Sequence, residues 1–386
     1  MLSAASALLI ASAVTIDLSA RIEGRSATES AVGFPATNAV QLDAQAAAGA
    51  RLDDFQFRLT YAPRLLYSDP LPAGARGAEI FHTASAGVAW RISRTKRLSL
   101  EETASYGHQD FSPLVASPLG TSAPPTDPRL PLLQSLSYLS LGTRLSYEDA
   151  LTPRLRLGTQ GSYLVSGGGD AEAREFLPLQ RAAQLGCNLA WTADSRSTFS
   201  VSGSANRSTF SGGDESILIS GSLGWQFAFR RGPRVAVQAG AGVSRAGDPF
   251  DARPWLANVN GGIGIGDEIR LGHQRISGSL EGTVSATIDR LTGDVYQLAQ
   301  GSAQLGFQVL RELHISAHGS AGRGLSGAQQ GSTVALVGLS ASIGLFKRVG
   351  LSIGGRGAWT QYTDASPGLM TWSASAVVTI AHHERF

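Results

Sequence analysis

The side chains best suited to catalysis are few in this sequence, and their spacing argues against a catalytic centre. His314, Ser316 and His318 alternate along one stretch and would share one face of a β-strand. Two histidines at positions i and i+4 of a strand lie about 13 Å apart, too far for both to bind one metal ion. A nucleophilic enzyme needs a nucleophile, a histidine base and an orienting partner within hydrogen-bond reach. We therefore expect no enzyme, no metal site and no cofactor.

Two further motifs give no chemistry either. Cys187 is the single cysteine, so an intramolecular disulfide is impossible, and we expect an inert thiol on a strand. The glycine-rich stretch 261–266 resembles a phosphate loop, but no Lys-Ser or Lys-Thr ends it and no helix is expected after it. A net charge of only +2 gives no reason to expect nucleic-acid binding.

Apolar and polar residues alternate along most of the chain, as they do in β-strands whose two faces meet different surroundings. Between Thr333 and Phe346, the odd positions from 335 to 345 are Ala, Val, Leu or Ile, and the even positions from 338 to 344 are Gly or Ser. The alternation predicts about 18 strands, at 14–23, 38–51, 55–67, 79–92, 97–108, 135–147, 154–166, 180–192, 197–207, 215–230, 234–245, 255–266, 275–288, 294–309, 312–322, 333–346, 349–362 and 371–385.

The predicted connections alternate in length. Short ones fall at 94–96, 150–153, 194–195, 231–233, 311–312 and 347–348, and longer ones rich in Gly, Pro and Ser at 25–37, 69–77, 166–176, 246–254 and 324–331. Tight turns at one end and longer loops at the other are the layout of bacterial outer-membrane barrels, whose tight turns face the periplasm.

Composition supports a membrane sheet. Charged residues are 16% of the chain, against roughly 25% in typical soluble domains, and no run of about 20 apolar residues predicts a spanning helix. A sheet in hydrocarbon must close on itself, because every backbone N–H and C=O needs an internal partner. We therefore predict an all-β fold, a transmembrane antiparallel up-and-down β-barrel of about 18 strands (16–18) in the lipid of a Gram-negative outer membrane. A soluble β-sandwich, with the same alternation turned inward, is the alternative.

A barrel of this size predicts a pore, since 16–18 strands leave an aqueous channel. The face opposite the apolar residues is rich in Ser, Gly, Gln and Asn, and such a mildly basic wall would suit sugars or anionic polymers. The predicted pore-lining residues are Arg58, Arg64, Arg144, Arg156, Arg234, Glu281, Gln300, Gln304 and Arg356.

The termini and the longest connection give three further expectations. Residues 1–13 resemble a signal-peptide remnant, because a short apolar core precedes Ala11-Ser12-Ala13, and 14–386 would form one barrel. Phe386 would end the last strand on its apolar face, as in the signal that the barrel-assembly machinery recognises. The connection 109–134 contains six prolines, which cannot pair in a sheet, so it would either constrict the pore or project outward.

Three segments repeat one strand-and-turn pattern, at Phe55–Tyr67, His82–Tyr106 and Leu145–Leu157. In this pattern the chain resembles the outer-membrane barrels found with exopolysaccharide synthesis and export systems in myxobacteria and related Gram-negative bacteria. The resemblance implies a final outer-membrane conduit for a secreted polysaccharide, working with a periplasmic polysaccharide-export protein. It carries no functional residue over to this chain.

Three functions remain open from the sequence. The first is a conduit for polysaccharide export, and the second is a general diffusion porin for small hydrophilic solutes. The third is a structural or adhesin barrel whose lumen is plugged by its own loops.

Overall fold

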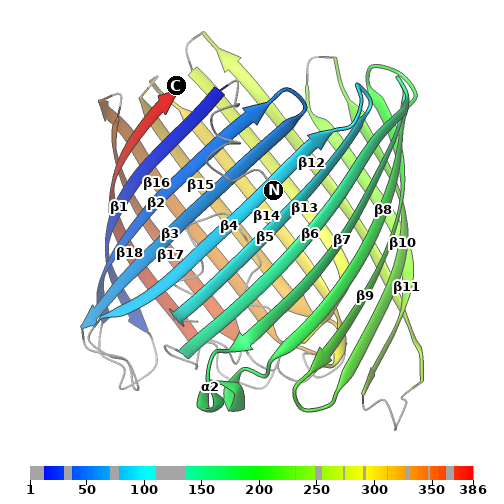
Figure 1. The fold of residues 1–386 in the computed structure, drawn as a ribbon, viewed down its shortest axis with the longest axis horizontal. Coiled ribbons are helices and arrows are strands. Elements are labelled where there is room, and N and C mark those ends of the chain that lie inside the picture. The colour runs from blue at the N-terminus through cyan, green and yellow to red at the C-terminus, as the bar shows by residue number, and fades with distance from the viewer. Residues whose placement is uncertain are drawn as a thin grey trace, which may run out of the picture.

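The computed structural model describes residues 13–29, 37–69, 78–109, 136–230, 232–247, 254–272, 274–289, 293–310, 312–326, 330–346, 348–361 and 369–385. These residues form one antiparallel sheet of 18 strands and one short helix (Figure 1). The strands are β1 (Ala13–Glu29), β2 (Thr37–Leu52), β3 (Phe55–Asp69), β4 (Glu79–Arg91), β5 (Lys96–Gln109), β6 (Leu136–Thr152), β7 (Leu155–Gly168), β8 (Gln180–Thr192), β9 (Ser197–Phe210), β10 (Glu215–Ala228), β11 (Arg234–Gly247), β12 (Leu256–Leu271), β13 (Gln274–Ile288), β14 (Val295–Gln308), β15 (Leu313–Gly324), β16 (Thr333–Phe346), β17 (Val349–Gln361) and β18 (Leu369–Arg385).

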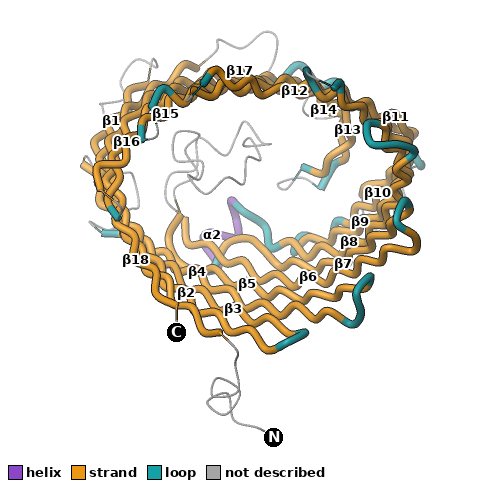
Figure 2. Tube along the Cα trace, turned by 90° about the horizontal axis from the view of Figure 1, so that it is seen from above, coloured by secondary structure: helices purple, strands orange, loops and turns teal. Residues whose placement is uncertain are grey.

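The sheet closes on itself. β1 pairs with β2 along one side and with β18 along the other, from Thr15 opposite Arg385 to Glu29 opposite Thr371. Seen from above, the strands form a ring (Figure 2). Closure gives each strand two hydrogen-bonded neighbours, which is what a sheet in hydrocarbon requires. The prediction of an antiparallel barrel of about 18 strands is confirmed.

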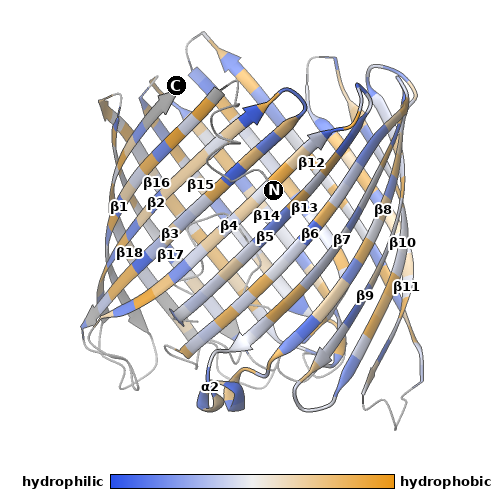
Figure 3. Ribbon diagram, in the orientation of Figure 1, coloured by the Kyte–Doolittle hydropathy of each residue, from blue (hydrophilic) through white to orange (hydrophobic). Residues whose placement is uncertain are grey.

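The barrel is apolar outside and polar inside. Leu185 and Leu223 point outward and are 68% and 65% exposed, whereas Gln41 and Ser208, on the opposite face of their strands, are fully buried at 0%. Figure 3 shows the alternation as orange and blue bands along each strand. A soluble sandwich would bury its leucines, so this arrangement belongs to a barrel whose outer wall meets lipid.

The two ends of the barrel differ. At one end, here called the tight-turn end, strands join through short turns such as 153–154 and 193–196. The opposite end is the long-connection end, where β3–β4, β7–β8 and β15–β16 are joined, although the β9–β10 connection there spans only 211–214. The described ends of the chain, Ala13 and Arg385, both lie at the tight-turn end. By the general rule for bacterial barrels, this end faces the periplasm.

One short helix, α2 (Ala171–Phe176), lies between β7 and β8 at the long-connection end (Figure 1). The Asp170 carboxylate caps it by accepting a hydrogen bond from the Ala173 N–H at 2.8 Å. The sequence predicted only a loop here, because a six-residue helix leaves no periodic pattern of apolar residues.

Candidate functional site

All nine predicted pore residues lie on the inward face of their strands. Several stand next to outward apolar side chains, as Arg58 beside Leu59, Arg144 beside Leu145 and Gln304 beside Leu305. They are spread over seven strands, so the structure does not gather them into one cluster. They are Arg58 and Arg64 on β3, Arg144 on β6, Arg156 on β7, Arg234 on β11, Glu281 on β13, Gln300 and Gln304 on β14, and Arg356 on β17.

Arg64 and Arg144 have side-chain partners within the wall. The Arg64 guanidinium pairs with the Asp43 carboxylate at 3.0 Å. Arg144 donates from Nη2 to the Gln160 side-chain oxygen at 2.8 Å, and it stands opposite Glu101 in the β5–β6 register. These pairs hold the guanidinium groups against the wall.

The inner face of β5–β12 forms a groove of about 550 Å³. Its floor is a band of hydroxyl and amide groups. Ser202 and Ser222 are hydrogen-bonded at 2.6 Å, Ser204 and Ser220 at 2.8 Å, and Gln238 donates to Ser222 at 2.6 Å. The groove also includes Glu101, Arg144, Gln160, Asn188 and Asn260.

Glycines within this band leave the space that neighbouring polar groups occupy. A Cβ at Gly240 would overlap the Gly221 carbonyl oxygen and the Asn260 amide oxygen, so only glycine fits between these strands. At Gly186 a Cβ would come within 3.2 Å of the Gln160 side chain, which lies across this glycine. The small residues therefore let longer polar side chains lie flat along the wall.

A charged cluster lies inside the tight-turn end, on β11–β13. This rim cluster consists of Arg234, Glu268, Arg270 and Arg275. The Glu268 carboxylate accepts from Arg270 Nε at 2.9 Å and pairs with Arg275 Nε at 3.2 Å, and Arg234 interacts with it electrostatically. Three guanidinium groups around one carboxylate leave this rim with a net charge of +2.

Of the rim cluster, only Arg234 was among the pore residues predicted from the sequence. The alternation ended the predicted strand at residue 266, but β12 continues to Leu271 and β13 begins at Gln274. Apolar alternation fades where a strand leaves the apolar layer. The charged residues on both sides of Gly272, with Glu268 and Arg270 before it and Arg275 after it, are the sequence signal that could have indicated the longer hairpin.

Two histidines of the inward face, His314 and His318, pack against neighbouring strands. The ring of His318 lies over Gly338 and that of His314 lies near Gly306, each covering a glycine of a neighbouring strand. Across the described ranges, no group of three or more His, Cys, Asp or Glu side chains could hold a metal ion. Within the same ranges, no helix has the length and apolarity needed to cross a membrane.

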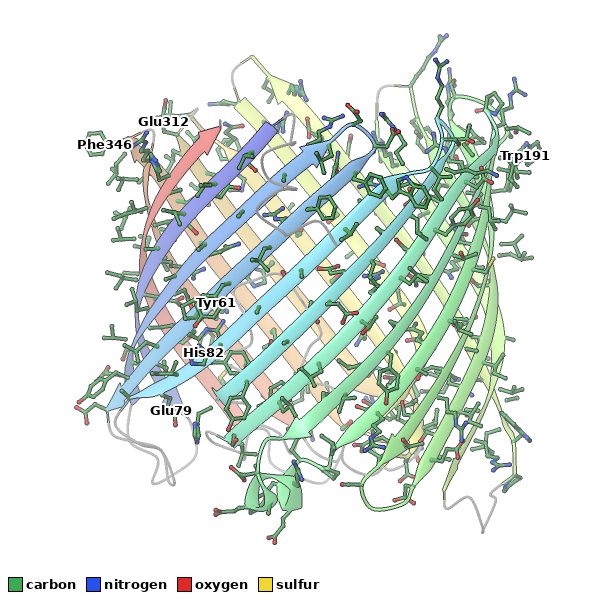
Figure 4. All side chains as sticks on the ribbon, viewed as in Figure 1. Tyr61, Glu79, His82, Trp191, Glu312 and Phe346 are labelled. Carbon is green, nitrogen blue, oxygen red and sulfur yellow. The ribbon has the colours of Figure 1, made fainter. Side chains whose placement is uncertain are left out.

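The outer wall carries aromatic side chains near the tight-turn end. Ring centroids lie 5.4 Å apart for Phe55 and Trp90 and 5.7 Å apart for Trp191 and Phe199. Phe227 and Phe229 meet edge to face at 4.8 Å. Figure 4 shows Trp191 and Phe346 at this end of the wall. Such a band matches the interfacial girdle of outer-membrane barrels.

Three sequence predictions lie wholly or largely outside the described residues. These are the signal-like segment, described only from Ala13, the terminal residue Phe386, and the proline-rich connection, described only at Gln109.

Solved structures share this fold. OccAB4 of Acinetobacter baumannii has a TM-score of 0.52 and 8% identity, covering 96% of this chain and 98% of its own. The outer-membrane protein OpdK of Pseudomonas aeruginosa has 0.52 and 10%, covering 96% and 99%. The FrpB iron transporter of Neisseria meningitidis has 0.55 and 9%, covering 91% of this chain and 64% of its own. At such low identity the likeness shows the fold alone.

The comparison with protein families gives one match over nearly the whole chain. The model of the EpsX exopolysaccharide export family matches residues 2–383. The comparison with curated proteins gives no match.

Proposed function

Because this chain belongs to the EpsX exopolysaccharide export family, we propose that its barrel is the channel through which a secreted polysaccharide crosses the outer membrane. The family and the outer-membrane barrel fold together make it an outer-membrane pore of an export system. The observation that carries the proposed path is the inner wall of β5–β12, with its continuous serine, asparagine and glutamine groups.

This wall suits a sugar polymer because hydroxyl and amide groups can replace the water around saccharide hydroxyls. Each such exchange changes the free energy little, on the order of 1 kcal/mol per hydrogen bond. A polymer in contact with many weak sites can bind and still move on, which conduction requires. Of the nine predicted residues, Arg144, Arg156 and Arg234 lie on these strands, and the other six would line the rest of the lumen without forming one tight binding site.

The charges of the wall favour neutral or anionic polymers. Arg58, Arg144, Arg156 and Arg356 face inward at spread positions, and the inward acidic side chains include Asp17, Asp43, Glu101 and Glu281. The described residues offer no metal site, and the two histidines cover glycines. We therefore propose that the wall passes its substrate unchanged, without catalysis.

The tight-turn end is the proposed docking side for a periplasmic polysaccharide-export protein. Its rim cluster carries a net charge of +2 inside the mouth, so an acidic surface on the partner would fit it. We also propose that the barrel-assembly machinery recognises the last strand through Phe386.

Cells that lack this barrel test the proposal directly. We expect them to lose surface polysaccharide, and the wild-type gene to restore it. The double variant Arg144→Glu/Arg156→Glu should restore much less of an anionic polymer, because it reverses two inward charges. Arg154→Glu is the matched control, since Arg154 lies exposed in the turn between β6 and β7. Normal export without the barrel would overturn the proposal, and slower uptake of small solutes alone would indicate a diffusion porin.

A further inference from the structure

A group of charged side chains faces outward, toward lipid, at the long-connection end of β8–β11. This arginine patch consists of Arg181, Arg207, Arg245 and Glu215. Each lies an even number of residues from an exposed apolar side chain on its own strand. Those apolar side chains are Leu185 on β8, Val201 on β9, Ile219 on β10 and Val243 on β11.

The strand register brings the three arginines together. Arg207 and Arg245 both pair with Ile217, from opposite sides of β10, so their backbones lie about 10 Å apart. Arg207 also pairs with Ala183, two residues from Arg181 on β8, which makes Arg181 and Arg207 diagonal neighbours at about 7–8 Å. A headgroup with two phosphates can span these distances.

The net charge of the patch is positive, and one of its arginines is held in place by an ion pair. Glu215 accepts from Arg207 Nε at 2.8 Å and from Nη2 at 3.2 Å, and three arginines with one glutamate leave +2. The Arg207 side chain remains 65% exposed while that of Glu215 is 14% exposed, so the less exposed carboxylate orients the more exposed guanidinium. No acidic side chain among the described residues pairs with Arg181 or Arg245.

The place of the patch is informative because outward arginines are costly in a membrane wall. An arginine on the lipid face costs about 2–4 kcal/mol at the bilayer midplane and only about 0–1 kcal/mol near the interface. At the tight-turn end, the outward faces of β8–β10 carry Trp191, Phe199 and Trp225 instead. The cationic residues thus stand only where the wall of these strands meets the leaflet opposite the periplasm.

An apolar furrow lies on the same outer face, on β6–β9. It measures about 470 Å³, its floor includes the small residues Thr159, Cys187 and Gly203, and its sides include Leu145 and Leu185. Gly203 lies four residues before Arg207 on the same face of β9, about 13 Å along the strand. An acyl chain that descends from a headgroup at the patch would reach this furrow.

We propose that this face binds a phosphorylated glycolipid of the outer leaflet, with its phosphates on Arg181, Arg207 and Arg245 and an acyl chain along the furrow. Guanidinium groups bind phosphate oxygens through paired, charge-assisted hydrogen bonds. The site lies on the outer wall, so it does not depend on what passes through the pore.

Binding of defined lipids to the purified full-length barrel tests this proposal. Native mass spectrometry would compare bis-phosphorylated lipid A with the same lipid after removal of both phosphates. We expect the wild type to bind the phosphorylated form at least tenfold more tightly, and Arg181→Gln/Arg207→Gln/Arg245→Gln to lose that preference. Equal binding of both lipids, or an unchanged preference in the triple variant, would overturn the proposal.

Two controls separate specific binding from general effects. Arg323→Gln removes an outward arginine from the long-connection end of β15, several strands away, and should leave the preference intact. Gly203→Leu fills the furrow and should weaken lipid A binding while leaving the weak binding of inorganic phosphate unchanged. Inorganic phosphate that bound as tightly as lipid A would contradict a lipid site. Comparison of gel migration with and without heating would confirm that each variant is folded.

Discussion

At Gly240 the inner wall has no room for a side chain, and the band of serines around it also consists of small residues. A Cβ there would meet two backbone atoms of β10, at Gly221 and Ser222, and the Asn260 side chain on β12. Backbone cannot move aside without breaking the sheet. Small side chains on the inner wall therefore keep the lumen open to solvent and substrate.

We predict that Gly240→Ala destabilises the barrel by about 1–3 kcal/mol, the usual cost of overpacking. Urea unfolding in lipid vesicles, followed by tryptophan fluorescence, would measure the change in free energy. Gly203→Ala is the matched control, because a Cβ at Gly203 would lie 3.8 Å from the nearest backbone oxygen, an ordinary contact. Equal stability of the two variants would contradict the packing described for Gly240.

The rim cluster gives an electrostatic prediction. Glu268→Gln removes the carboxylate between Arg270 and Arg275 and should shift the reversal potential of the open pore toward anion selectivity. The side chains are 41–68% exposed, so stability should change by less than about 1 kcal/mol. Glu312→Gln makes the same change of charge in the connection between β14 and β15 (Figure 4). A shift of equal size in that control would show that the effect is not specific to the rim.

At the scale of elements, alternation was enough to predict all 18 strands in order, and the strand at 333–346 was predicted to the residue. Strand ends were predicted less accurately. The predicted ends at 23, 147 and 266 fall short of the ends of β1, β6 and β12 in the structure, which are Glu29, Thr152 and Leu271. The alternation of apolar and polar residues is present only where one face of a strand meets lipid. Strand pairing continues beyond the lipid layer, where the sequence shows no alternation. Helix α2 and the rim cluster lie in these polar margins.

The turn between β8 and β9 provides a prediction on pH. The N–H groups of Arg196 and Ser197 donate to the Asp194 carboxylate and hold its pKa below the ordinary value of 3.8. A lowered pKa means that this stabilisation is present above about pH 4 and is lost as the pH falls through the lower, folded-state value. Asp194→Ala should therefore show a flatter fall in unfolding midpoint below pH 4 than the wild type. Parallel curves would contradict this role.

At the scale of the whole molecule, the barrel is an inverted protein whose leucines face outward and whose polar groups face inward. Leu185 and Gln184 are neighbours on β8 that face opposite sides. We predict that Leu185→Arg costs about 2–4 kcal/mol and lowers the folded fraction in lipid vesicles, whereas Gln184→Arg is tolerated. Gel migration with and without heating would measure that fraction. The reverse result would mean that the faces are assigned the wrong way round.

The sequence was enough to predict which residues face the pore, but not which of them contact one another in polar clusters. Period-two alternation is enough to assign Arg144 or Gln304 to the inward face. It cannot show that Arg144 bonds Gln160, or that Ser202 meets Ser222 and Gln238, because these contacts depend on the register between strands. The outward arginine patch depends on register in the same way.

The central claim is that this barrel conducts a polysaccharide, and single-channel recording in a planar bilayer tests it most directly. Purified protein would be inserted and secreted polymer added on the side of the tight-turn end. We predict large, stable openings that the polymer blocks in a voltage-dependent way, with shorter block in Arg144→Glu/Arg156→Glu. Openings that pass small sugars and ignore the polymer, or no openings at all, would contradict the claim.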